Sequence, residues 1–230
     1  MRDGRKTCVI IPALNEERSI ARVIEEIPCW VDDIIVADNG STDGTPRAAR
    51  AAGARVVIEP RRGYGSACLK ALAMVQAPDV IVFLDGDYSD FPAEMDSLVD
   101  PILGNRADLV IGSRIAGPRQ PGALTPQALF GNWLSCRLMY WIWGVAFTDL
   151  GPFRAIRYSS LKRLSMADPD YGWTVEMQIK AVVTGLRCLE IPVGYRKRIG
   201  KSKVSGTLRG VIGAGTKILW LIARNAVAGP

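Results

Sequence analysis

The hydrophobic residues in the first half of the chain fall into short runs separated by longer segments. The short runs are rich in valine and isoleucine, as expected of buried strands, and the segments between them have the length of helices. This alternation is typical of βαβ units and of a mostly parallel sheet. It predicts strands at residues 7–11, 33–38, 55–59, 80–84 and 109–112, and helices beginning at Ser19, Thr45, Ser66 and Ala93.

Two long apolar segments in the second half follow a different pattern. Residues 127–147 are rich in aromatic side chains and contain Arg137, and residues 208–228 combine Trp220 with Arg209, Lys217 and Arg224. Neither has an uncharged run long enough to span a bilayer comfortably. Aromatic residues beside isolated cations suit helices that lie in the membrane interface. Alternatively, the two segments are a pair of core helices, or they form a dimer interface in a homo-oligomer.

These patterns divide the chain of 230 residues into two parts. Residues 1–205 form the main α/β domain, including the interfacial helix at 127–147, and residues 206–230 form a C-terminal amphipathic helix. The chain runs directly into its first strand, so we expect no signal peptide. We predict a cytoplasmic protein bound peripherally to the inner face of the membrane.

The basic residues are concentrated at the C-terminal end. Eight of the 29 Lys and Arg residues follow Glu190, the last acidic residue, which leaves 21 of them against 23 Asp and Glu within residues 1–190. A basic segment of this kind suits nucleic acid, anionic lipid or a phosphate ligand, or is simply a solvated face. The cations here accompany Gly200 and Ser202 in a turn-like stretch rather than a recognition helix, so we expect no nucleic-acid partner.

The chain has no histidine, and its five cysteines are scattered without metal-ligand spacing. Both facts argue against a zinc site. Asp85 and Asp87 instead bracket Gly86 at the end of an apolar run. Alternate residues of an extended segment face the same way, so the two carboxylates can face one Mg²⁺ or Mn²⁺ ion. Phosphate oxygens usually complete the coordination shell of such an ion. A helix cap or a turn is the alternative for such a pair.

Further polar clusters follow other predicted strands, and ligands of open α/β sheets bind outside the carboxyl ends of the strands. Pro12, Asn15 and Glu16 suit recognition of a nucleobase and ribose, or a helix N-terminus. In residues 38–45, Asp38 suits a nucleobase edge and Asp43 the start of the next helix, and an ordinary loop is the alternative. The turn that begins at Gly63 suits either a phosphate cradle or tight backbone packing.

These motifs, in this order and spacing, resemble family 2 glycosyltransferases with the GT-A fold. The motifs are Pro12-x-x-Asn15-Glu16, Asp38-x-Gly-Ser-x-Asp43-Gly-Thr45, Gly63-x-Gly65-x-Ala67 and Asp85-x-Asp87. The resemblance implies a Rossmann-like, mostly parallel sheet flanked by helices, a nucleoside-diphosphate sugar donor, a divalent metal and inversion at the anomeric carbon. It also implies that Ala13, Glu16 and Asp38 surround the nucleoside, and that Asp85 and Asp87 lie at the metal and diphosphate.

Motifs in the second half resemble the polyprenyl-phosphate branch of this family, typified by dolichol-phosphate mannose synthases. They are Gly112-Ser-Arg114, Gly131-Asn132, residues 149–154 and residues 195–203. The resemblance implies that Arg114, Arg198, Ser202 and Lys203 hold the phosphates of donor and acceptor. One position departs from the family: Ser89 stands where relatives often have Gln, which leaves the outer metal shell and the donor preference open.

A phosphate acceptor fits a chain without histidine. A phosphate monoester, with a second pKa of about 6, is largely ionised at neutral pH and can attack without a protein base. Should the acceptor be a hydroxyl, Asp149 is the candidate base; orienting Arg154 is its alternative role.

The sequence therefore predicts an inverting, metal-dependent transfer of a hexose from a GDP- or UDP-sugar to a polyprenyl phosphate. There are two alternatives: an enzyme that uses the same donor with a soluble acceptor, and a nucleotide-sugar-binding protein without catalytic activity. The candidate catalytic residues are Asp87, Asp149 and Arg114, and the candidate metal ligands are Asp85 and Asp87. The candidate substrate-binding residues are Pro12, Ala13, Asn15, Glu16, Asp38, Asp43, Gly63, Asp85, Gly86, Arg114, Arg198, Ser202 and Lys203.

Overall fold

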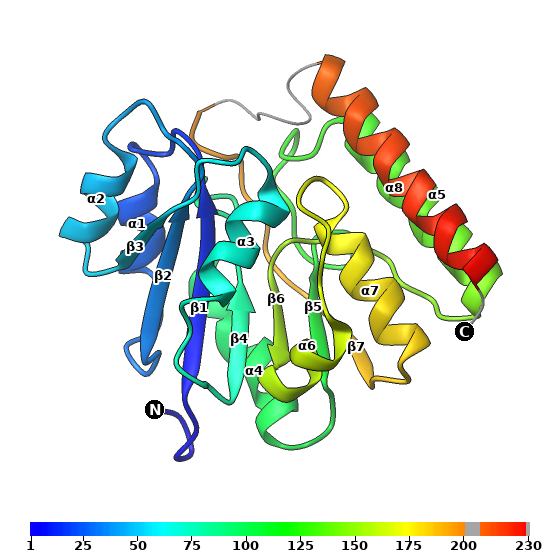
Figure 1. Ribbon diagram of the computed structural model, residues 1–230, viewed down its shortest axis with the longest axis horizontal. Helices are drawn as coiled ribbons and strands as arrows, with labels where there is room; N and C mark the ends of the chain where they lie inside the picture. Colours follow the sequence, from blue (N-terminus) through cyan, green and yellow to red (C-terminus); the bar gives the residue numbers. More distant parts are fainter. Residues whose placement is uncertain (201–207, 229–230) are drawn as a thin grey trace.

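The computed structural model describes residues 1–200 and 208–228, in which strands and helices alternate along most of the chain (Figure 1). The elements are β1 (Thr7–Ala13), α1 (Ile20–Glu25), β2 (Asp33–Asp38), α2 (Thr45–Ala51), β3 (Arg55–Ile58), α3 (Tyr64–Leu72), β4 (Val80–Phe83), the 3₁₀ helix η1 (Pro92–Glu94), α4 (Met95–Leu103), β5 (Leu109–Ser113), α5 (Pro126–Trp143), β6 (Arg154–Arg157), α6 (Tyr158–Leu164), α7 (Trp173–Val183), β7 (Cys188–Pro192) and α8 (Leu208–Ala228). Ser202 and Lys203 lie outside the described residues.

The strands of the described residues form one sheet in the order β3-β2-β1-β4-β6-β5-β7. The pairs β1–β2, β1–β4, β2–β3 and β5–β7 are parallel, whereas β6 runs antiparallel to both β4 and β5. The expectation of a mostly parallel, Rossmann-like sheet flanked by helices is confirmed. Neither β6 nor β7 was predicted from the hydrophobic pattern.

Helices cover both faces of the sheet, because alternate strand residues point to opposite sides. Ile10, Ile35 and Ile81 pack into one core with α3, α5, α6 and α7. Val9, Val36 and Val82 pack into the other with α1, α2 and α4. Burial on both faces explains why these strands are apolar throughout rather than alternating.

The predicted boundaries in the first half agree with the structure to within two residues. Strand β2 has the predicted limits, and β1 continues to Ala13, so that Pro12 and Ala13 belong to the strand end rather than to the turn after it. Helix α3 begins at Tyr64, before the predicted Ser66. The helix expected from Ala93 begins as the 3₁₀ helix η1 and becomes α4 at Met95.

Helices α5 and α8 pack against each other at one side of the sheet (Figure 1). Thr125 caps α5 by accepting a hydrogen bond from the Ala128 N–H (3.2 Å), and Gly144, with a φ of 71°, ends it before the predicted residue 147. Only Ser135, Cys136 and Met139 of α5 are buried, and most of its aromatic side chains face outward. Within residues 1–200 and 208–228, no helix has the length and apolarity to cross a bilayer.

Candidate active site

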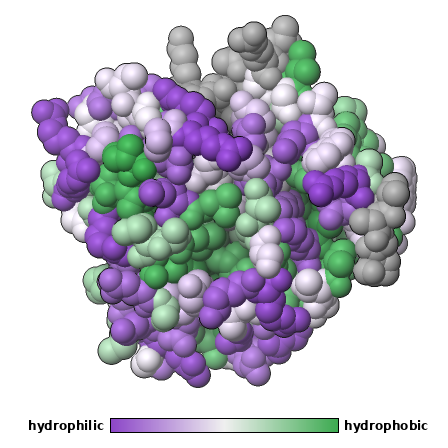
Figure 2. Space-filling view, viewed as in Figure 1, coloured by the Kyte–Doolittle hydropathy of each residue, from purple (hydrophilic) through white to green (hydrophobic). Residues whose placement is uncertain are grey.

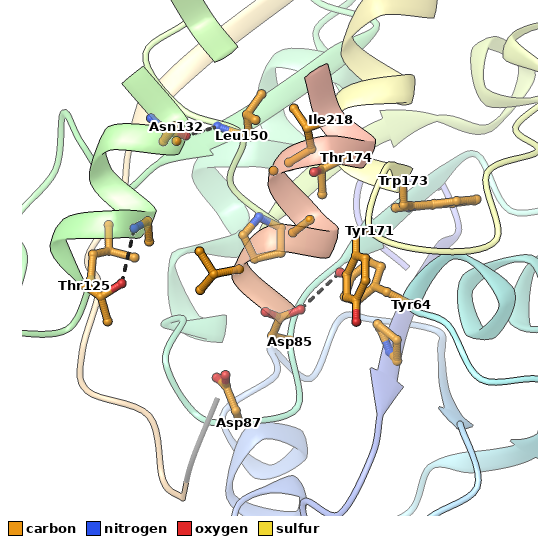
Figure 3. Close-up of a pocket in the computed structure, with 18 of the residues that line it drawn as sticks. Tyr64, Asp85, Asp87, Thr125, Asn132, Leu150, Tyr171, Trp173, Thr174 and Ile218 are labelled. Carbon is orange, nitrogen blue, oxygen red and sulfur yellow. Dashed lines mark hydrogen bonds between the residues drawn. The ribbon is translucent and has the colours of Figure 1, made fainter. Parts of the chain in front are cut away.

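A cavity of about 1120 Å³ lies at the carboxyl ends of β1 and β4. The chain crosses from β3 at one edge to β4 on the far side of β1, so the strand order reverses between β1 and β4, which is where open α/β sheets bind ligands. Asp85 and Asp87 lie at one end of this cavity, and Asn132 of α5 and Ile218 of α8 contribute to its walls (Figure 3). The cavity therefore joins the sheet edge to the α5–α8 pair.

The side chains of Asp85 and Asp87 both line the cavity, as predicted from their spacing. The Tyr64 hydroxyl donates to Asp85 Oδ1 (3.1 Å). Ser89 donates to Asp87 Oδ1 from its backbone N–H (2.9 Å) and its hydroxyl (2.5 Å), and Arg198 Nη1 lies 2.7 Å from Asp87 Oδ2. Ser89, the residue that departs from the family pattern, thus orients the second carboxylate.

Three carboxyl groups crowd this end of the cavity. Burial, together with the neighbouring Asp87 carboxylate, raises the pKa of Asp85 to about 6. Burial and the charges of Asp85 and Asp87 hold the pKa of Asp90 well above its usual range. Asp90 Oδ2 accepts a hydrogen bond from the Asp85 N–H (3.3 Å), and its Oδ1 has no partner among the described residues. Asp90 belongs to none of the sequence motifs.

The residues present fit a hard divalent cation. Asp85 and Asp87 offer carboxylate oxygens from one short loop. A bound cation would offset the electrostatic repulsion between these two carboxylates. No cluster of three or more His, Cys, Asp or Glu side chains suited to a metal occurs in the described part of the chain. A cation here would therefore need ligands from a substrate or water to complete its shell.

Arg114 at the end of β5 is held by Asp149. Its Nε and Nη2 donate to the two oxygens of Asp149 (2.7 and 2.6 Å), and its backbone N–H donates to Oδ2 (2.8 Å). Burial alone would lower the pKa of Arg114, but the Asp149 carboxylate outweighs that effect and raises it. Arg114 therefore presents a permanent cation to the cavity, which it lines.

Asp149 itself is completely buried and is absent from the cavity wall. Its carboxylate contacts Arg114 rather than Arg154, whose guanidinium donates instead to the carbonyl oxygens of Leu150, Gly151 and Thr174. Glu190 supports the same loop by accepting from the Asp149 N–H (3.0 Å). The geometry of Asp149 is that of a residue that positions Arg114.

The basic segment after β7 runs beside the Asp87 loop. The Arg196 and Ile199 N–H groups donate to the carbonyl oxygens of Ser89 and Asp87 (both 2.9 Å). Arg196 pairs with Glu26 (2.7 Å), and its Cζ lies 3.3 Å from the ring centroid of Tyr88. Arg198 lines the cavity, whereas Arg196 does not.

The residues that follow β1 and β2 divide into two groups. Pro12, Ala13 and Glu16 line the cavity. Asn15 and Asp43 instead tie two loops together: Asn15 Oδ1 accepts from the Thr42 N–H (2.7 Å), and Asp43 Oδ2 accepts from the Glu17 N–H (3.3 Å).

Asp38 lies just behind the cavity wall and is 2 % exposed. Its Oδ2 accepts from the Ser41 N–H (3.2 Å), and its Oδ1 has no partner among the described residues. The next residue, Asn39, lines the cavity and was not predicted to do so. A buried carboxylate oxygen without a donor is a place where a ligand hydrogen-bond donor would be favourable.

The turn at Gly63 packs tightly against residues 168–170. The Gly63 N–H donates to Asn39 Oδ1 (2.8 Å), and the Ser66 N–H donates to the Pro169 carbonyl (2.7 Å). A Cβ at Gly65 would lie 1.9 Å from the Asp168 carbonyl oxygen. Gly63 lines the cavity, but of the two interpretations of this turn the geometry matches tight backbone packing. Gly86 also lines the cavity, between the two aspartates.

Residues 8–165 match the family model described as glycosyl transferase family 2. The chain belongs to glycosyltransferase family 2. It is 36% identical over 213 residues to an uncharacterized glycosyltransferase of Mycobacterium tuberculosis, covering 91% of this chain and 94% of the relative. It is 32% identical over 202 residues to a dolichyl-phosphate hexose transferase of Haloferax volcanii, covering 85% of each chain.

The fold of this glycosyltransferase also matches solved structures. The crystal structure of glucosyl-3-phosphoglycerate synthase from Mycobacterium tuberculosis, in complex with Mn²⁺, UDP-glucose and phosphoglyceric acid, superposes with a TM-score of 0.77 at 26% identity. The match covers 97% of this chain and 80% of the other. The predicted GT-A architecture and the prediction of an enzyme of this family are therefore confirmed.

Four further residues of the glycosyltransferase line the cavity although no sequence feature marked them as site residues. They are Arg62, Tyr64, Tyr171 and Thr174. Tyr64 stood inside a motif considered only for its glycines, and its hydroxyl contact to Asp85 depends on how α3 packs. Trp173 is 1% exposed, packs edge-on to Phe83 and also lines the cavity.

Proposed function

We propose that this glycosyltransferase moves a hexose from a nucleoside-diphosphate sugar to a polyprenyl phosphate, with inversion at the anomeric carbon. The observation that carries the proposal is one cavity that joins the Asp85–Asp87 pair, two arginines and a long apolar wall. The carboxylates suit a metal–diphosphate complex, the arginines suit phosphate groups, and the apolar wall suits a lipid.

The donor end of the cavity is assigned to Asp85, Asp87 and the residues after β1 and β2. Asp85 and Asp87 would hold Mg²⁺ or Mn²⁺, which when bound neutralises charge on the donor diphosphate. Pro12, Ala13 and Glu16 would contact the nucleoside, with Asp38 directly behind them. The structural neighbour was solved with Mn²⁺ and UDP-glucose, which supports this part of the proposal. Asn15 and Asp43 would act indirectly, by holding the loops.

The acceptor phosphate needs cations more than it needs a base. One of its oxygens forms a bond to C1 of the hexose as the bond from C1 to the donor phosphate oxygen breaks, and the nucleoside diphosphate leaves with the electron pair. The acceptor is already largely ionised, so no proton must be removed. Arg114 and Arg198 would offset the repulsion between the two anionic substrates, with Asp149 as a positioning residue. The roles of Ser202 and Lys203 stay predictions.

The membrane partner is proposed from the outward face of α5 and α8. Phe130, Trp133, Trp141 and Trp220 are all more than half exposed. Arg137 lies over the Trp141 ring, and Arg224 lies over the Trp220 ring. Aromatic rings with neighbouring cations suit the lipid headgroup region, so we propose peripheral binding to the cytoplasmic face of a membrane.

A soluble acceptor is the second candidate, because the structural neighbour was solved with phosphoglyceric acid. A hydroxyl acceptor would need a proton acceptor, and the buried Asp149, with both oxygens engaged by Arg114, is poorly placed for that role. This argument favours the phosphate acceptor.

The test is a screen of purified protein with Mn²⁺ and each of GDP-mannose, GDP-glucose, UDP-glucose and UDP-N-acetylglucosamine. Each donor is assayed alone, with a polyprenyl phosphate and with 3-phosphoglycerate, and release of nucleoside diphosphate is measured. Release that depends on the lipid phosphate supports the proposal and identifies the donor. Release only with 3-phosphoglycerate, or release that ignores the lipid, contradicts it. The variant Asp85→Asn serves as the inactive control.

A further inference from the structure

The cavity has two chemically different ends. One end carries Asp85, Asp87, Arg114 and Arg198, and the other is an apolar arm between α5 and α8. The total volume of about 1120 Å³ exceeds the range of about 300–1,000 Å³ that holds one small ligand. The apolar arm therefore offers room beyond what a nucleotide sugar requires, and it is contiguous with the charged end.

Each helix supplies a row of small or apolar residues to the walls of the arm. Four lining residues of each helix recur three, four and seven positions apart, which is the spacing of one helix face. They are Ala128, Gly131, Leu134 and Ser135 on α5, and Val211, Ala214, Gly215 and Ile218 on α8. On α5, the adjoining Gln127, Phe130 and Asn132 also line the cavity.

Two glycines widen the arm from opposite sides. Glycine within a helix is destabilising relative to alanine, and close packing of two helices is a common reason for keeping it. Gly131 of α5 and Gly215 of α8 have no such contact, because no neighbouring atom lies within 4 Å of where a Cβ would stand. Both glycines border open space in the arm instead.

The outer end of the arm opens on the exposed aromatic face of α5 and α8. Phe130 and Leu219 line the cavity and are nevertheless 61% and 39% exposed. In Figure 2, hydrophobic residues lie beside hydrophilic ones over α8, at the right of the view. The apolar lining thus runs from the arginines at the inner end to an aromatic surface with adjacent cations.

We infer that the isoprenoid chain of the acceptor lies in this arm, between Gly131 and Gly215, with its phosphate at Arg114 and Arg198. The inference rests on the proposed polyprenyl-phosphate acceptor and adds the path that its hydrocarbon chain takes. Charge complementarity at the inner end and apolar walls that continue to the outer surface select an anionic lipid over a polar acceptor. The isoprenoid enters from the membrane beside Phe130 and Leu219.

The test compares acceptors of different chain length in variants that fill the arm. Gly131→Leu and Gly215→Leu each place a side chain in the open space, one from each wall. Thr216→Leu is the matched control, because Thr216 is exposed on α8 and is absent from the cavity wall. For each protein, kcat/KM is measured with an undecaprenyl phosphate and with a phosphate carrying a single isoprene unit, and folding is checked by thermal unfolding.

We expect the ratio of kcat/KM for the long acceptor over the short one to fall at least tenfold in both glycine variants and to stay unchanged in Thr216→Leu. An unchanged ratio in folded Gly131→Leu and Gly215→Leu proteins overturns the path between the helices while leaving the acceptor class intact. No transfer by the unaltered protein to either acceptor overturns the proposed function, and the chain path with it.

Discussion

At the scale of single residues, the two arginines of the cavity are held in different ways. Arg114 is fixed by a carboxylate that is fully buried and has both oxygens engaged. Arg198 pairs with Asp87, which itself lines the cavity. Losing one partner of a buried ion pair leaves an uncompensated charge, whereas a pair at a cavity wall can be rehydrated. The Arg114–Asp149 pair therefore carries more of the stability.

Replacing Asp149 by Asn should reveal this positioning role. We expect Asp149→Asn to lower the free energy of unfolding by about 3–5 kcal/mol, because the Arg114 guanidinium loses its buried counter-charge. Urea denaturation measures the change, with Asp108→Asn, which unpairs two partly exposed arginines, as a milder control. A variant of unchanged stability that had lost only its activity would point instead to a direct chemical role for Asp149.

The crowding of carboxylates makes the metal-free protein sensitive to pH. The pKa of Asp85 is raised from 3.8 to about 6, so the folded state holds this proton more tightly than the unfolded chain. That contribution to stability is fully present below about pH 4 and is lost as the pH rises through about 6.

The variant Asp85→Asn should remove this dependence. In the absence of metal, we compare the free energy of unfolding of the variant with that of the unaltered protein. We expect the difference to shift in favour of the variant by about 2–3 kcal/mol from pH 4 to pH 7, since one pKa unit corresponds to 1.36 kcal/mol. Urea denaturation at both pH values, in the presence of a chelator, measures the difference. A stability difference between the two proteins that does not change with pH would contradict the shifted pKa. Asp79→Asn, at the opposite end of β4, is the control.

At the scale of elements, glycines in this fold serve opposite purposes. Gly65 of α3 lets the helix backbone touch residues 168–170, where a Cβ would meet the Asp168 carbonyl oxygen. Gly131 of α5 has nothing within 4 Å. The same residue type therefore marks tight packing in one helix and open space in another, and sequence spacing alone cannot distinguish them.

Alanine substitutions should separate the two glycines. We expect Gly65→Ala to destabilise the protein by about 1–3 kcal/mol through overpacking, and Gly131→Ala to stabilise it by about 0.5–1 kcal/mol through helix propensity. Thermal or urea unfolding measures both. Equal effects of the same sign would contradict the difference in packing.

At the scale of the whole molecule, the charged cavity and the exposed aromatic face lie on connected parts of one surface. Phe130 of α5 belongs to both, because it lines the cavity and is also exposed. A membrane against that face would bring the lipid acceptor to the arginines without any helix of the described residues crossing the bilayer. The orientation of the enzyme then follows from the packing of α5 against α8.

Exposed tryptophans should dominate membrane binding. We expect Trp133→Ser and Trp141→Ser each to weaken binding to anionic vesicles about tenfold, because burying one large apolar side chain contributes about 1.5–3 kcal/mol. Vesicle sedimentation measures the change. Ile58→Ser is the control, because Ile58 is also exposed but lies on the edge strand β3, far along the sheet from α5. Equal losses in all three variants would contradict a specific face.

The α/β architecture and the Asp85–Asp87 end of the site follow from the order of residues in the chain. Short apolar strands, the helices between them and polar residues at strand ends are local features, and parallel strands bring their carboxyl ends to one edge. Asp85, Asp87, Ala13 and Glu16 therefore converge as their positions in the chain predict.

Contacts between distant side chains depend on how the elements pack in three dimensions. Packing pairs Asp149 with Arg114 instead of Arg154, and it turns Arg196 toward Glu26 while Arg198 faces Asp87. It also inserts β6 antiparallel between β4 and β5, and it leaves an apolar arm between α5 and α8. These outcomes depend on packing between segments far apart in the chain, and the spacing of residues in the sequence does not specify that packing.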